Sequence, residues 1–194
     1  ESFDAAVLGC GGIPAARPNE YAHLIRAYTQ AHRAYHTRQH LTECLSYLRV
    51  AQEEVSEFVD SAHKIAEIAL ALWYHDAIYR PQRGDNEDRS ARWFRFRAQQ
   101  FMIPPSAIER ISAMILATRH GNAALSNDAK TQLLVDIDLA ILAAPAERFR
   151  EYCEQIRFEY AFVPTAIFSH KRQQVLREFL AQKNIYHSAF GVSL

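Results

Sequence analysis

The sequence places a histidine and an aspartate side by side within an apolar run. His75 and Asp76 follow the apolar residues 69–74 and precede Ala77 and Ile78. Burying an imidazole and a carboxylate together is unfavourable unless both are hydrogen-bonded or bind a metal ion. The pair alone therefore fits either a hydrogen-bonded core pair or part of a metal site. His40 upstream and Asp138 downstream also lie in apolar helical surroundings, and they favour the metal site.

These residues must be positioned by helices, because apolar residues recur at spacings of three and four along most of the chain. We count about eight such helices and no convincing strand. The sequence therefore predicts an all-α bundle. Residues 1–18 are rich in Gly and Pro and lack periodicity, so we expect an irregular N-terminal arm there. Residues 19–194 are expected to form a single helical domain.

The composition indicates an ordinary globular chain. Its 194 residues are 49% hydrophobic, and 22 Lys and Arg balance 22 Asp and Glu. This charge balance provides no global attraction to nucleic acid or to an anionic membrane, so neither is expected as a partner. Three widely spaced cysteines favour a reducing compartment, and no apolar run approaches the roughly 20 residues that span a bilayer. We expect a cytoplasmic protein, with a homodimer as an open possibility.

The chain resembles the HD superfamily of metal-dependent phosphohydrolases, whose members carry a His, a His-Asp pair and a later Asp. It looks closest to a small bacterial branch of that superfamily, in the blocks formed by residues 33–36 with His40, residues 72–79 and residues 85–91. The resemblance extends from Ala22 to Leu180. It implies an HD-domain-like helical bundle. It also implies a set of four metal ligands, which are His40, His75, Asp76 and Asp138.

Two aspartates compete for the last ligand position. Asp136 and Asp138 would point about 200° apart on a helix, so they are not expected to face one metal together. The family pattern, an Asp followed directly by Leu, selects Asp138. We expect Asp136 to face solvent or to form hydrogen bonds.

Two imidazoles and two carboxylates suit a divalent cation of hard to borderline character. The candidates are Mn²⁺, Fe²⁺, Ni²⁺, Co²⁺, Zn²⁺ and Mg²⁺. Four protein ligands leave positions open on an octahedral ion, where a bound water can be activated and a phosphoryl oxygen polarised. Asp76 is expected to take part in catalysis, and it could bridge two metals if His120 contributes to a second site.

Further residues are candidates for catalysis or for binding a substrate phosphate. Glu87 follows the His-Asp pair and fits either a general base or a second-shell carboxylate, although it could merely support the start of a helix. The resemblance suggests His36 and His120, whereas Arg side chains match phosphate by their forked geometry. The substrate-binding candidates are His36, Arg89, His120, Arg157, Lys171 and Arg172. For the basic residues of this set, a solvated helix face is the alternative.

The function expected from these features is hydrolysis of a small phosphoester, most simply a nucleotide, by a metal-activated water. Two alternatives stay open. One is a di-iron oxygenase of the same fold, which would need further histidine ligands. The other is a regulatory module that binds a metal or nucleotide without turnover.

Overall fold

The computed structural model of the protein describes residues 2–55, 61–119 and 127–194. Within these ranges the chain forms ten α-helices and no strand, which confirms the predicted all-α fold. The elements in chain order are α1 (Phe3–Gly9), the 3₁₀ helix η1 (Pro14–Ala16), α2 (Glu20–Ala27), α3 (Arg38–Glu54), α5 (Ala62–Tyr74), α6 (Asn86–Gln100), α7 (Pro105–Ala117), α8 (Ala129–Asp138), the 3₁₀ helix η2 (Leu139–Ala143), α9 (Ala146–Glu159), α10 (Thr165–Ala181) and α11 (Ala189–Val192). None of these helices is long and apolar enough to cross a bilayer.

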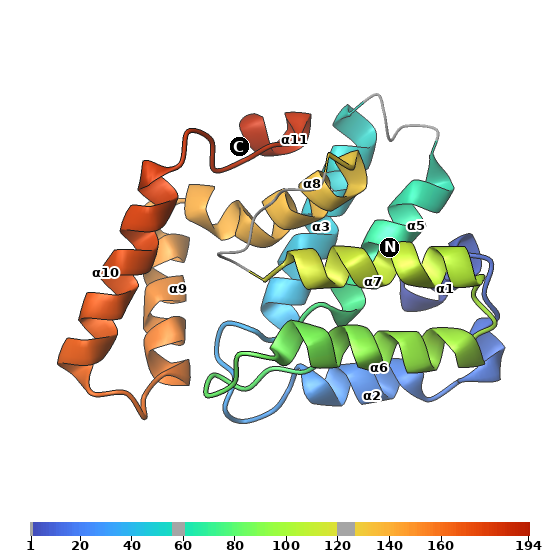
Figure 1. Ribbon diagram of the computed structural model, residues 1–194, viewed down its shortest axis with the longest axis horizontal. Helices are drawn as coiled ribbons and strands as arrows, with labels where there is room; N and C mark the ends of the chain where they lie inside the picture. Colours follow the sequence, from blue (N-terminus) through green and yellow to red (C-terminus); the bar gives the residue numbers. More distant parts are fainter. Residues whose placement is uncertain (1, 56–60, 120–126) are drawn as a thin grey trace.

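Helix α5 is the centre of the core. All its residues from Ile65 to Tyr74 are buried, as expected of a helix that is apolar on every side. Helices α1, α3, α7 and α8 all pack against it, and Figure 1 shows them gathered around it. The C-terminal end of α5 therefore lies inside the molecule, and this is the end that leads into His75 and Asp76.

The N-terminal segment differs from the irregular arm that its composition predicts, because residues 3–9 form helix α1. Ser2 caps this helix by accepting a hydrogen bond from the amide of Ala5, and Phe3, Ala6 and Val7 are buried. Their spacing is that of an amphipathic helix, but its seven residues make a weak pattern beside the glycines that follow. Gly9 allows α1 to approach α5 closely, since a Cβ there would collide with Ala66.

Helices α9 and α10 form a hairpin at one side of the molecule (Figure 1). Its core is small: Tyr152 and Ile156 of α9 pack with Tyr35 and Ile141. None of the residues of α10 is buried. The hairpin therefore lies beside the main core, and residues of both parts line a cavity between them.

The connection from α2 to α3 sets the position of His36. The histidine spacing at positions 32, 36 and 40 would give one stripe on a continuous helix, but α3 begins only at Arg38. Thr37 caps it by accepting from the amide of Gln39. His36 consequently lies in the preceding loop, and His40 lies in the first turn of α3.

A buried carboxylate, Glu67 of α5, joins three helices of the core. It accepts hydrogen bonds from Arg110 Nε of α7 at 3.0 Å and from Lys130 Nζ of α8 at 2.5 Å. Burial alone raises the pKa of Glu67, but these two cations lower it below its usual value. The charge is therefore held in the folded state by its partners.

We predict that Glu67→Gln lowers the free energy of unfolding at neutral pH by about 2 to 3 kcal/mol, because two cations lose a charged acceptor. Urea denaturation measures the effect. Glu109→Gln is the matched control, since Glu109 forms an exposed ion pair with Arg95 that is worth about 0.5 kcal/mol or less. Equal, small losses in both variants would contradict the role assigned to Glu67.

Candidate metal centre

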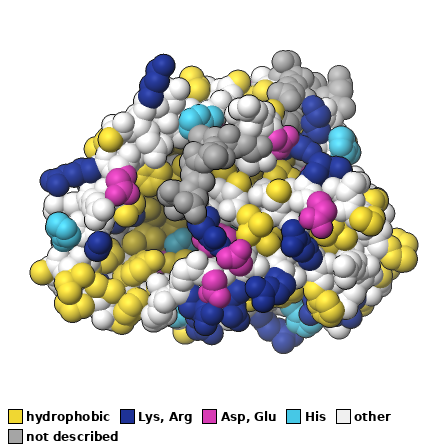
Figure 2. Space-filling view, viewed as in Figure 1, with side chains coloured by type: hydrophobic (Ala, Val, Ile, Leu, Met, Phe, Trp, Pro, Cys, Tyr) yellow, Lys and Arg dark blue, Asp and Glu magenta, His cyan; other side chains and the backbone are white. Residues whose placement is uncertain are grey.

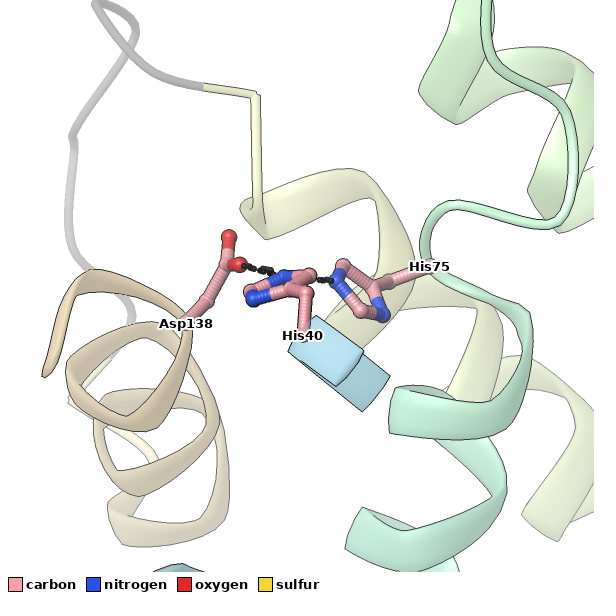
Figure 3. Close-up of side chains that lie close together, drawn as sticks. All are labelled: His40, His75 and Asp138. Atoms are coloured by element: carbon pink, nitrogen blue, oxygen red, sulfur yellow. Dashed lines mark hydrogen bonds and ion pairs between the residues drawn. The ribbon is translucent and has the colours of Figure 1, made fainter. Parts of the chain in front are cut away.

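Four of the predicted site residues meet where the first turn of α3 lies close to the C-terminal ends of α5 and α8. His40 lies in the first turn of α3, His75 and Asp76 directly follow α5, and Asp138 is the last residue of α8. Figure 3 shows three of these side chains pointing toward one another from their separate helices. Side chains at helix ends are held by well-packed elements and still face the space beyond those elements.

The ligand atoms of these residues converge on one point. His40 Nε2 lies 3.2 Å from His75 Nε2 and 3.1 Å from Asp138 Oδ1. His75 Nε2 lies 3.4 Å from Asp138 Oδ1 and 3.1 Å from Asp76 Oδ2, and Asp76 Oδ2 lies 3.7 Å from His40 Nε2. His40, His75 and Asp138 each offer a ligand atom within 4.8 Å of the others, so this group could hold a metal ion.

The tautomer of His75 agrees with a metal ligand. Its Nδ1 lies 2.7 Å from the carbonyl oxygen of Leu72, to which it donates a hydrogen bond. With this proton on Nδ1, Nε2 is the atom that faces His40 and the carboxylates, and a metal ion bound there would take the place of the second proton of the imidazole. A hydrogen bond of this kind on the far nitrogen is typical of metal-binding histidines.

The charges of the cluster stabilise one another. Burial alone lowers the pKa of His75, yet Asp76 and Asp138 raise it well above its usual range. Burial alone raises the pKa of Asp138, but hydrogen bonds from His40 and His75 bring it well below its usual range. Both carboxylates therefore stay ionised in a nearly buried setting that attracts positive charge strongly.

Arg33 fixes the loop that carries the His-Asp pair. This guanidinium is 6% exposed and donates hydrogen bonds to the carbonyl oxygens of Asp76 at 2.7 Å, Ala77 at 3.1 Å and His36 at 3.1 Å. It thereby replaces the helical hydrogen bonds that end with α5. It also links the loop before α3 to the segment after α5, so that the two histidine-bearing segments are held together.

Glu159, the last residue of α9, performs a similar role from the hairpin. Its Oε1 accepts from the backbone amides of Ala34 and Tyr35 at 2.8 Å and of His36 at 3.0 Å. Its Oε2 lies 2.7 Å from His36 Nδ1 and accepts from the hydroxyl of Tyr79 at 2.8 Å. One buried carboxylate thus satisfies a whole turn of backbone and orients His36.

Glu159 is not among the site residues that the sequence predicts. A signal is nevertheless present, because Tyr152, Ile156 and Glu159 recur at spacings of four and three and all three are buried. A carboxylate on the apolar face of a helix requires partners. Those partners are backbone amides more than a hundred positions away in the chain, and periodicity cannot predict them.

The two aspartates of α8 have separate roles. Asp136 is fully buried and accepts hydrogen bonds from the amides of His187 and Ser188 and from the Ser188 hydroxyl. It anchors the segment that leads into α11, and a Cβ on Gly191 would clash with it. Asp136 is therefore a hydrogen-bonding residue and does not face solvent, while Asp138 is the residue that joins the histidines.

A cavity of about 490 Å³ opens over the cluster, between the hairpin and the core. Asp76, Asp138 and His36 line it, and Figure 2 shows hydrophobic side chains gathered around the hollow. Lys171 and Arg172 of α10 also line it. The cluster is thus accessible to a ligand of moderate size.

The remaining predicted residues are placed differently from one another. Glu87 lines the cavity, and its Oε2 lies 3.5 Å from Arg119 Nε. Arg89 is exposed and does not line the cavity. Arg157 donates to the carbonyl oxygens of Tyr160 and Val163, so it closes the turn between α9 and α10. His120 lies outside the described residues.

Two of the predicted substrate-binding residues do not line the cavity, and their part in substrate binding stays a prediction. The guanidinium of Arg157 is engaged by the end of its own helix, where a cation is favoured by the helix dipole. Arg89 is an exposed residue of α6. Neither contributes to the wall of the cavity, whereas His36, Lys171 and Arg172 do.

Comparison with known proteins identifies no relative. No protein-family model, curated protein or solved structure matches the chain.

We predict that substitutions of Asp136 and Asp138 have different effects, one on stability and the other on metal binding. Asp138→Asn should weaken Mn²⁺ binding by at least about 100-fold, because a charged ligand is lost. Asp136→Asn should leave the Mn²⁺ affinity unchanged and lower the free energy of unfolding by about 1 to 3 kcal/mol. Isothermal titration calorimetry and urea denaturation measure the two effects. Metal binding that survives Asp138→Asn and fails in Asp136→Asn would contradict the assignment.

We also predict an acid-sensitive contribution from Glu159. Burial alone raises the pKa of this carboxyl group, but hydrogen bonds from His36 and the backbone lower it from 4.5 to about 2. A lowered folded-state pKa stabilises the fold above pH 4.5, and that stability is lost as the pH falls toward 2. The full contribution is about 3 kcal/mol.

The measurement compares the free energy of unfolding of the wild type and of Glu159→Gln between pH 7 and pH 2. The difference between them should shrink as the pH falls below 4.5. Glu154→Gln, an exposed position on the same helix, serves as the control and should show no such trend. A difference that is constant across this range would refute the role of the ionised carboxylate.

Proposed function

We propose that the protein is a metal-dependent hydrolase of small phosphoesters, of the HD type that its motifs resemble. The observation that carries this proposal is the convergence of His40, His75 and Asp138, with Asp76 beside them, below a cavity that the two aspartates and cationic side chains line. The four ligands come from the residues that the resemblance selects, and their ligand atoms lie close together. A nucleotide is the simplest substrate of this class.

The ligand set fits a divalent cation of hard to borderline character. His40 and His75 direct two Nε2 atoms at one point, with carboxylate oxygens of Asp76 and Asp138 beside them. Two carboxylates balance the charge of a divalent ion. When bound, such an ion supplies Lewis acidity at the phosphoryl group and a water of lowered pKa. Among the described residues one such group of ligands is found, and His120, the candidate for a second metal site, lies outside them.

The side chains around the cluster have the chemistry that a phosphoester requires. Lys171 and Arg172 line the cavity from α10 and would bind phosphate oxygens. One terminal nitrogen of Arg172, Nη2, is buried without a hydrogen-bond partner among the described residues. A buried donor of this kind is unfavourable unless a ligand satisfies it. The guanidinium is therefore suited to an anionic oxygen.

Two further residues would handle protons and orientation. The Glu87 carboxylate lines the cavity near the start of α6 and would accept a proton from the attacking water. Arg119, which follows the C-terminal end of α7, forms an ion pair with this carboxylate. His36, fixed by Glu159 at Nδ1, lines the cavity next to Asp76 and would contact the substrate.

Phosphate release by the metal-stripped protein, reloaded with Mn²⁺, tests the proposal across nucleoside mono-, di- and triphosphates. We expect Mn²⁺-dependent turnover, and Asp76→Ala should lower kcat by at least about 100-fold through loss of a metal ligand. Arg177→Gln on the outer face of α10 is the control and should retain full activity. An Asp76→Ala protein with wild-type turnover would refute the proposal. Iron bound at two ions per chain, with oxygen consumption, would replace hydrolysis by oxygenase chemistry.

A further inference from the structure

The cavity above the cluster is divided into polar and apolar regions. Its floor is formed by His36, Asp76 and Asp138, and Lys171 and Arg172 supply positive charge from α10. The wall that η2, α9 and α10 contribute is otherwise mainly apolar. Its principal members are Leu139, Ile141, Leu142, Ile156, Phe168 and Val175. A phosphate group alone would use the charged residues and leave this wall without contacts.

The wall is built on the hairpin, where apolar side chains are incompletely covered by the protein itself. Val175 remains 39% exposed, and Phe168 is only partly buried. Apolar surface in a cavity of about 490 Å³ is typical of sites that bind small organic ligands. The wall therefore favours a ligand with an apolar part, which would remove this surface from water.

The chemistry of the wall discriminates between possible organic groups. A nucleobase presents hydrogen-bond donors and acceptors along its edge, and those groups need partners when they leave water. The apolar members of the wall offer none, and Tyr152 and Tyr160 add only hydroxyl groups. An aryl or alkyl group has no such requirement, so it matches the wall more closely than a base does.

Aromatic contacts connect the cationic region of the cavity to the metal ligands. The guanidinium of Arg172 lies 4.9 Å from the ring centre of Tyr152. The Tyr152 ring is 4.5 Å from that of Tyr35, which in turn is 4.7 Å from the imidazole of His40. The Arg172 guanidinium, whose Nη2 atom has no hydrogen-bond partner among the described residues, is held in position by its contact with the Tyr152 ring. A phosphate between Arg172 and the cluster would leave the organic part of its ester against the apolar wall.

We infer that the substrate is a phosphoester with an apolar aryl or alkyl group, bound against the wall formed by η2, α9 and α10. This inference rests on the proposed function and narrows its substrate class. It favours such esters over nucleotides, which stay the comparison in the test.

Calorimetric binding of phosphonates to the Mn²⁺-loaded protein tests the inference, because phosphonates keep the anionic group and are not hydrolysed as esters. 1-Naphthylmethylphosphonate, methylphosphonate and a nucleoside 5′-phosphonate are compared. We expect the naphthyl compound to bind about tenfold or more tightly than methylphosphonate, through apolar burial. It should also bind more tightly than the nucleoside compound. Equal affinity of the naphthyl and methyl compounds, or tighter binding of the nucleoside compound, would overturn the inference.

Substitutions of wall residues test whether the preference for the naphthyl compound arises at the apolar wall. Phe168→Ala should remove most of the naphthyl preference while leaving the methylphosphonate affinity unchanged, whereas Phe158→Ala, an exposed position on α9, should change neither. Val175→Thr keeps the side-chain volume at a partly exposed position and should weaken only naphthyl binding, which protects the test against misfolding of the Phe168 variant. A full naphthyl preference in both wall variants would place the ligand elsewhere and contradict the inference.

Arg172→Gln separates the anionic contact from the apolar one. It should weaken all three phosphonates by a similar factor, of about tenfold, because a charged hydrogen bond is lost. Arg177→Gln on the same helix should leave them unchanged. A naphthyl preference without hydrolysis of any phosphoester would refute the proposed function and keep the binding inference. Hydrolysis without any preference for apolar esters would support the proposed function and overturn the inference about the apolar group.

Discussion

The structure depends on two ionised carboxylates held together at helix C-termini inside the protein. Asp138 ends α8 and Asp76 follows α5, where the helix dipole disfavours negative charge. Burial adds to that cost. His40 and His75 offset it through contacts of 3.1 to 3.4 Å. A divalent cation at the same point would balance both charges at once, which accounts for the meeting of the start of α3 with the ends of α5 and α8.

The surrounding protein keeps these helix ends in register. Arg33 binds the carbonyl oxygens beyond α5, and Glu159 binds the amides before α3. Arg33 is a buried cation and Glu159 a buried anion, and each satisfies several backbone groups that no helix could satisfy. Because Glu159 belongs to α9, the hairpin that forms the apolar wall is tied directly to the loop that carries His36. Ligand binding at the wall and geometry at the cluster are therefore physically connected.

Much of this arrangement follows from the sequence, and the exceptions have physical reasons. Helical periodicity predicts the all-α fold, and the angle between Asp136 and Asp138 predicts that they face different partners. The sequence does not predict helix α1, since about two amphipathic turns are a weak signal beside three glycines and two prolines. The roles of Arg157 and Glu159 also could not be predicted, because charge type alone does not show whether a side chain meets a substrate or a backbone group across the fold.

Anomalous diffraction would test whether His40, His75, Asp76 and Asp138 hold a metal ion. Crystals grown with Mn²⁺ would be measured on both sides of the manganese absorption edge. We expect one strong anomalous peak within about 2.0 to 2.3 Å of the Nε2 atoms of the two histidines and of the oxygens of the two aspartates. A featureless map at the cluster, at a Mn²⁺ concentration that labels other surface sites, would contradict it.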